Sequence, residues 1–154
     1  MILNRQKKIR VAEGPLNKFL VEVQRGLNVS EAEVSIALVS DREMAKWNEQ
    51  YRKKKGSTDV LSFPAVTLRR IARHRRAKSS TGKQHGSNVS FLGDVAIAPE
   101  TAQRYAKKNG RTLEQELRVL ILHGVLHLMG YDHEHDQGQM NRIEKKLRRK
   151  MGIE

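Results

Sequence analysis

Apolar residues recur every three or four positions in several stretches of the chain, which is the spacing of amphipathic helices. The first stretch starts behind Pro15, a residue that suits the first turn of a helix, and it ends near Asn28. Asp41 is predicted to cap a second helix that runs to about Arg52. A shorter helix is predicted over Glu100–Lys108, where an Asn-Gly pair ends it.

The longest helical stretch opens at Thr112 and is apolar around most of its circumference. Its apolar residues are Leu113, Leu117, Leu120, Leu122, Val125, Leu126 and Leu128. A helix of this kind is buried, so we expect it at the centre of the core. A last amphipathic helix follows, with its basic side outward and its core side formed by Met140, Ile143, Leu147 and Met151.

Three short apolar runs rich in β-branched residues predict strands at Val34–Val39, Val60–Phe63 and Phe91–Ala98. Proline follows the second and third runs, and proline interrupts strand pairing. Helices and strands in this mixed order predict an α+β fold, with a small mixed β-sheet packed against about five helices. The chain has 154 residues and no internal repeats, so we expect residues 1–154 to form one domain around one core.

Between the last two predicted strands lies a polar, basic stretch at about 67–88, for which we expect an exposed loop. A short helix over Leu68–Ala77 is the alternative. The whole chain carries 30 Lys and Arg against 17 Asp and Glu, a net charge of +13. Such an excess is typical of proteins that bind polyphosphates, although a merely soluble basic surface has the same composition. The candidate phosphate contacts are Lys53, Lys54, Arg69, Arg70, Arg73, Arg75 and Arg76.

The chain contains no cysteine, so neither disulfides nor thiolate metal ligands are available. The first residues lack the apolar run of a signal peptide, and no stretch is long and apolar enough to cross a bilayer. We therefore expect a soluble, cytoplasmic protein without a membrane partner, and no protein partner is identifiable from the sequence.

Three histidines form the pattern His-x-x-x-His-x-x-Gly-x-x-His at His123, His127 and His133. Positions four apart on a helix lie about 40° apart around its axis and about 6 Å along it, so the first two share a face. The third would point away on a continuing helix, and Gly130 is the residue type that ends helices in the left-handed conformation. The pattern predicts that all three imidazoles converge on one metal ion.

Three protein ligands leave a fourth position open, which is typical of catalytic rather than structural zinc. Zinc is favoured because imidazole suits it, and nickel, copper and iron also fit this ligand type. Metzincin proteases share this spacing but carry a glutamate directly after the first histidine as general base. Here that residue is Gly124, which argues against peptide hydrolysis.

The segment from His123 to His133, His-Gly-Val-Leu-His-Leu-Met-Gly-Tyr-Asp-His, resembles the signature of the YbeY family of bacterial endoribonucleases. Two further blocks are similar to that family. One is Asn48-Glu-Gln-Tyr51-Arg52 with the following Thr-Asp-Val-Leu-Ser-Phe-Pro at 58–64, and the other is Leu-Gly-Asp-Val at 92–95. The long basic segment between Pro64 and Leu92 departs from the family pattern, and we expect it to add contacts to ribosomal RNA.

The resemblance implies a zinc-dependent endoribonuclease that cuts single-stranded RNA in the maturation of the 3′ end of 16S ribosomal RNA and in ribosome quality control. Its partners would be ribosomal RNA and ribosomal particles. His123, His127 and His133 would be the metal ligands, with His123 and Arg52 in the catalytic centre. Asp132 could orient a ligand imidazole or simply form a turn.

Two other functions fit the same sequence. One is a zinc hydrolase with the metzincin-like ligand frame and a substrate other than RNA, and the strongly basic charge argues against it. The other is a non-catalytic ribosome assembly factor that is stabilised by its metal. The open fourth position of the predicted site argues against a purely structural metal.

Overall fold

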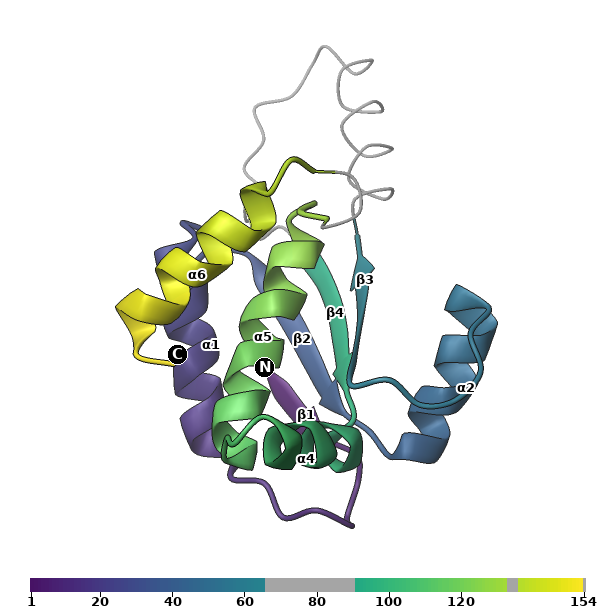
Figure 1. The fold of residues 1–154 in the computed structure, drawn as a ribbon. Helices are drawn as coiled ribbons and strands as arrows, with labels where there is room; N and C mark the ends of the chain where they lie inside the picture. Colours follow the sequence, from purple (N-terminus) through teal and green to yellow (C-terminus); the bar gives the residue numbers. More distant parts are fainter. Residues whose placement is uncertain (66–90, 133–135, 154) are drawn as a thin grey trace, which may run out of the picture.

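The computed structural model describes residues 1–65, 91–132 and 136–153. Four strands form one sheet in the order β1-β2-β4-β3 (Figure 1). They are β1 (Ile2–Asn4), β2 (Glu33–Leu38), β3 (Val60–Pro64) and β4 (Phe91–Ile97). β1, β2 and β4 run parallel, whereas β3 pairs antiparallel with β4. The predicted small mixed sheet is confirmed.

Five helices surround the sheet in the described part of the chain. They are α1 (Glu13–Gly26), α2 (Asp41–Arg52), α4 (Pro99–Lys108), α5 (Leu113–Leu128) and α6 (Gln139–Met151). In Figure 1, α5 lies over one face of the sheet with α1 and α6 beside it, while α2 stands apart from them near β3. This arrangement confirms the α+β class.

The central position of α5 follows from its sequence. Its start is fixed by a capping box, in which Thr112 and Gln115 exchange hydrogen bonds between side chain and backbone. Ten of its sixteen residues are buried, as its apolar pattern predicted. The helix contacts α1, α4, α6, β3 and β4, and the large core around it extends to Phe19 and Ile36.

Two glycines let α5 and the sheet approach very closely. A Cβ added at Gly124 of α5 would lie 2.7 Å from a methyl group of Val95 in β4. A Cβ at Gly93 of β4, where φ is +144°, would lie 2.5 Å from the carbonyl oxygen of Phe63 and 2.7 Å from Leu128. Real side chains do not fit at such distances, so α5, β4 and β3 are held at a separation that only glycine permits.

The opposite face of the sheet carries a smaller apolar cluster under α2. Its buried members are Val39, Met44, Leu61, Ala96 and Ala98, with Ala37, Trp47 and Phe63 partly buried against them. α2 buries only Met44 and Asn48. One face of the sheet is therefore fully packed, and the other is covered in part.

The structure adds one strand and corrects one helix start. β1 has only three residues, too few to show the alternation that identifies a strand in a sequence. Ser40, not Asp41, is the N-cap of α2, because its side-chain oxygen accepts the backbone N–H of Glu43. Asp41 occupies the first helical position and binds another helix instead. The predicted basic loop at 67–88, with its alternative helix, lies outside the described residues.

Candidate metal centre and adjoining cleft

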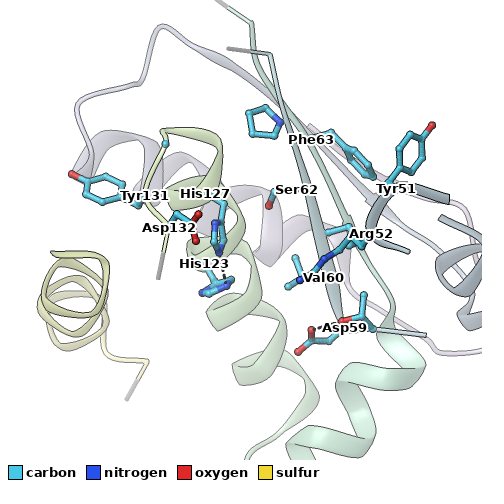
Figure 2. A pocket seen from close by; sticks show the side chains of 14 residues that line it. Tyr51, Arg52, Asp59, Val60, Ser62, Phe63, His123, His127, Tyr131 and Asp132 are labelled. Atoms are coloured by element: carbon cyan, nitrogen blue, oxygen red, sulfur yellow. Dashed lines mark hydrogen bonds between the residues drawn. The ribbon is translucent and has the colours of Figure 1, made fainter. Parts of the chain in front are cut away.

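The imidazoles of His123 and His127 project from the same face of α5 and meet at their tips (Figure 2). Their Nε2 atoms are 3.0 Å apart, with the ring centroids at 4.5 Å and the ring planes at 73°. Either nitrogen can be the donor, depending on the tautomer. The predicted shared face of these two histidines is thus present in the structure.

This geometry suits a metal ion. Two ligand nitrogens about 2.05 Å from a tetrahedral zinc ion stand about 3.3 Å apart, close to the observed separation. Within the described residues, no third His, Cys, Asp or Glu completes a metal-binding group with this pair. The third ligand predicted from the sequence, His133, lies outside them. Two of the three predicted donors therefore fit the ion, and His133 as the third stays a prediction.

The turn after α5 has the form that the histidine pattern required. Gly130 has a φ of +98°, and the backbone N–H of Tyr131 donates to the carbonyl oxygen of Leu126. This left-handed turn ends the helix directly behind the two histidines. It brings Tyr131 and Asp132 to the cleft, where Figure 2 places the Asp132 side chain beside the histidines. The role of Asp132 toward the metal ligands stays a prediction.

A second carboxylate, which sequence reasoning missed, approaches the ligand pair from α6. Glu144 is only 9% exposed, and its Oε1 lies 3.6 Å from Nδ1 of His123. Metal-binding histidines commonly direct the ring nitrogen that does not bind metal toward such a carboxylate, which fixes the ring and strengthens the ligand. The signal in the sequence was one acid on the apolar side of a helix whose other charged residues are all basic.

A cleft of about 860 Å³ opens in front of the histidines, and Arg52 lies on its far side. Arg52 is the last residue of α2, and its guanidinium points across Val60 into the cleft (Figure 2). The buried Asn48 supports this helix end by donating its side-chain N–H to the carbonyl oxygen of Gly56, 2.9 Å away. The structure thus brings two predicted site residues of α5 and one of α2 to the same cleft.

The cleft also contains residues for which the sequence predicts no role. Asp59 lines it with a carboxylate, and Ser62 donates a hydrogen bond of 3.3 Å to the carbonyl oxygen of Gly124. Both belong to the block at 58–64 that resembles the YbeY family. The resemblance therefore pointed to this segment but did not indicate what Asp59 and Ser62 do in the cleft. Tyr51 and Phe63 line the same cleft.

The predicted phosphate contacts fall into two groups. Lys53 and Lys54 are exposed directly after α2, where Lys53 adopts a φ of +58° and ends the helix. They do not line the cleft, and their contact with RNA stays a prediction. The others lie outside the described residues, namely Arg69, Arg70, Arg73, Arg75 and Arg76.

The start of α2 is fastened to α4 by the Asp41 carboxylate. Oδ1 accepts hydrogen bonds from Thr101 at 2.7 Å and Ser57 at 3.2 Å, and Oδ2 accepts one from Arg104 at 2.9 Å. Burial alone raises the pKa of this carboxyl, but the hydrogen bonds from Thr101 and Arg104 and the charge of Arg104 outweigh burial. The pKa of Asp41 therefore lies below its ordinary value of 3.8.

Gly124 faces the sheet, not the metal ligands. A glutamate at this position would meet Val95 before its carboxylate could reach the cleft. The protease general base is therefore absent from the sequence and has no room in this fold, which agrees with the argument against peptide hydrolysis.

Known proteins resemble the chain over nearly its whole length. A family described as "Endoribonuclease YbeY" matches residues 1–152. A relative from Koribacter versatilis is 37% identical over 153 residues, which cover 99% of this chain and 86% of the relative. Another from Aquifex aeolicus is 36% identical over 133 residues, or 86% of this chain and 77% of the relative. Each is described as "Endoribonuclease YbeY".

The solution structure of TM1509 from Thermotoga maritima is similar in fold, with a TM-score of 0.50 and 26% sequence identity. The match covers 95% of this chain and 85% of that protein. In the described residues, none of the helices combines the length and the apolar character that a membrane crossing requires.

Proposed function

The chain belongs to the YbeY family of endoribonucleases, and from this we propose that it is a zinc-dependent endoribonuclease specific for single-stranded RNA. Its proposed role is the maturation of the 3′ end of 16S ribosomal RNA and ribosome quality control, with ribosomal RNA and ribosomal particles as partners in the cytoplasm. The observation that carries the proposal is the convergence of the His123 and His127 Nε2 atoms in a cleft that Arg52 also lines.

We assign the zinc to His123, His127 and the predicted third ligand His133. When bound, zinc polarises a phosphoryl oxygen and activates water at neutral pH. Arg52 can hold the phosphate through two parallel N–H donors and stabilise the charge that develops on it. Glu144 holds the His123 ring in its orientation. Lys53 and Lys54 attract the neighbouring phosphates.

The test is cleavage of a 16S precursor extended at its 3′ end by the zinc-loaded chain. His127→Ala should lose both the metal and cleavage, whereas Arg52→Ala should keep the metal and lose most of the cleavage rate. Arg42→Ala is the matched control, because Arg42 is an exposed arginine at the other end of α2. This control should behave like the wild type. Metal content is measured by mass spectrometry of the purified proteins.

Equal cleavage by wild type, His127→Ala and Arg52→Ala would indicate a contaminating nuclease and overturn the proposal. A wild-type protein that holds zinc but cuts no single-stranded RNA would favour a hydrolase with another substrate. Loss of thermal stability in His127→Ala, without cleavage by the wild type, would favour an assembly factor stabilised by its metal.

A further inference from the structure

The sheet face under α2 has an uncovered part next to the cleft. Residues Leu3, Ala37 and Ala96 of β1, β2 and β4 stand side by side in register on this face. So do Ser35, Asp94 and Phe63 of β2, β4 and β3. α2 covers only one part of this sheet face, and a groove of about 360 Å³ remains above these residues. Ser35, Ala37 and Ala96 give the middle of its floor small side chains, so a flat group can lie close to the sheet there.

Three aromatic rings form one side of this groove. Phe63 lies between Trp47 and Tyr51, with ring centroids 6.2 Å from Trp47 and 5.2 Å from Tyr51, both edge to face. Tyr51 is 60% exposed although it is a large aromatic residue. Arg5 extends over the Trp47 ring with its guanidinium carbon 6.0 Å from the ring centroid. Trp47 and Phe63 are partly buried and Tyr51 is exposed, and accessible aromatic rings beside cations are surfaces on which nucleobases stack.

The groove and the cleft share Tyr51 and Phe63 as their common border. Figure 2 shows Arg52 directed into the cleft while the neighbouring Tyr51 ring points away from it. A strand whose phosphate lies at Arg52 would therefore pass Tyr51 when it leaves the cleft on this side. The next nucleotides along the strand would reach the groove.

The charges of the groove distinguish bases from phosphates. Asp94 presents an exposed carboxylate on the floor, which repels a phosphate but accepts hydrogen bonds from base amino groups. Arg5 is paired with Glu43 at 3.0 Å, so its charge is partly neutralised. Lys53 and Lys54, which follow Arg52 in the chain, form no salt bridge with the residues that the structure describes and do not line the groove. These charges favour an arrangement in which the bases lie in the groove and the phosphates lie along its rim.

We propose that this groove is a base-stacking site for the single-stranded RNA that extends from the catalytic cleft. The inference rests on the proposed function, because it places a further part of the same substrate. A second copy of this chain is the other occupant to consider. It is disfavoured because two chains of net charge +13 repel each other, whereas RNA is attracted.

The test uses Trp47, the only tryptophan of the chain, as a fluorescent reporter inside the groove. The full-length protein carries His127→Ala, so that the RNA stays uncut. It is titrated with a single-stranded oligoribonucleotide and with an abasic strand of equal length and charge. The RNA should quench Trp47 to saturation, while the abasic strand should bind at least tenfold more weakly and leave the fluorescence unchanged.

Two variants examine the groove from different sides. Tyr51→Ala removes an exposed ring and should weaken RNA binding about tenfold, with an unchanged dependence on salt because no phosphate contact is lost. Ser35→Phe fills the groove from its floor and should abolish the quenching. Tyr105→Ala is the matched control, since Tyr105 is 44% exposed on α4 and lines neither the cleft nor the groove.

Equal quenching by the abasic strand, or wild-type affinity in both Tyr51→Ala and Ser35→Phe, would overturn the inference. Quenching that grows with protein concentration without RNA, together with a dimer in sedimentation, would assign the groove to a second copy and overturn it as well. The proposed function fails separately, through the absence of cleavage in the wild type. Base-dependent quenching alongside intact cleavage supports both.

Discussion

The two helices that border the cleft are held in opposite ways. α5, which carries His123 and His127, has ten buried residues of sixteen and packs so closely against the sheet that only glycine fits at position 124. α2, which carries Arg52, has two buried residues of twelve and is fastened chiefly by polar contacts at its ends. A metal site needs ligands fixed within a few tenths of an ångström, and dense packing provides that.

A phosphate contact has different requirements. An arginine on a long flexible side chain can follow a substrate that changes shape during the reaction, and a lightly packed helix permits such movement. The comparison therefore favours a rigid side for the proposed metal and an adjustable side for the proposed RNA substrate. The following substitutions test this difference, starting with the largest expected effect.

Gly124→Ala should lower the free energy of unfolding by about 1–3 kcal/mol, because the new methyl group overlaps Val95. For a chain of this size, that corresponds to a drop of roughly 2–4 °C in melting temperature for each kcal/mol. Val95→Ala in the same chain should restore part of the loss by removing the overlapping methyl groups. Thermal unfolding of the two single variants and the double variant measures this coupling.

Gly14→Ala is the control for the glycine substitution. Gly14 lies in α1 with no atom within 4 Å of an added Cβ, so alanine should raise the free energy of unfolding by about 0.5 kcal/mol. A Gly124→Ala protein as stable as the wild type would show that α5 is not held rigidly against the sheet.

Glu144→Gln should weaken zinc binding about 10-fold to 100-fold, since the amide supports the His123 ring less well than a carboxylate. Competition with a chelating dye measures the affinity without reference to cleavage. The exposed neighbour Lys145→Gln should bind zinc like the wild type. Unchanged affinity in Glu144→Gln would limit this residue to a structural role in α6.

Asp41→Asn should destabilise the attachment of α2 to α4 by about 1 kcal/mol at pH 7, because a charge-assisted hydrogen-bond group is lost. The pKa of Asp41 is lowered by folding, so its carboxylate stabilises the protein above about pH 4 and loses that effect as the pH falls through the folded-state pKa. The stability difference between wild type and variant should therefore shrink in acid. A difference that stays constant from pH 7 to pH 3 would contradict this assignment.

Ser40→Ala should have the smallest effect, roughly 0.5–1 kcal/mol, through loss of the N-cap of α2. Hydrogen exchange should accelerate in α2 while α5 keeps its protection. Equal acceleration in both helices would indicate that they unfold as one unit, and the contrast between them would then be wrong.

The elements with strong patterns were predicted well from the sequence. The apolar circumference of α5 located it in the core, and the spacing of His123, His127 and Gly130 gave the shared face and the turn. The metal itself and the role of Arg52 toward RNA remain predictions.

What the sequence could not indicate depends on contacts between distant segments. Glu144 reaches His123 only after α6 packs on α5, and Asp41 finds Thr101 sixty residues away. The predicted N-cap of α2 is wrong by one residue because Ser40 and Asp41 are both good N-cap residues. The hydrogen bonds that Asp41 accepts from α4 are visible only in the fold. The groove likewise requires four strands in register.

The spacing of the His123 and His127 imidazoles has a consequence for the choice of ion. Both rings project from α5, the helix that packs against the sheet at Gly124, and their Nε2 atoms are 3.0 Å apart. An ion with short bonds to nitrogen, of about 2.0–2.1 Å, matches that spacing. Calcium, which prefers oxygen at 2.3–2.6 Å, is mismatched in both donor type and size.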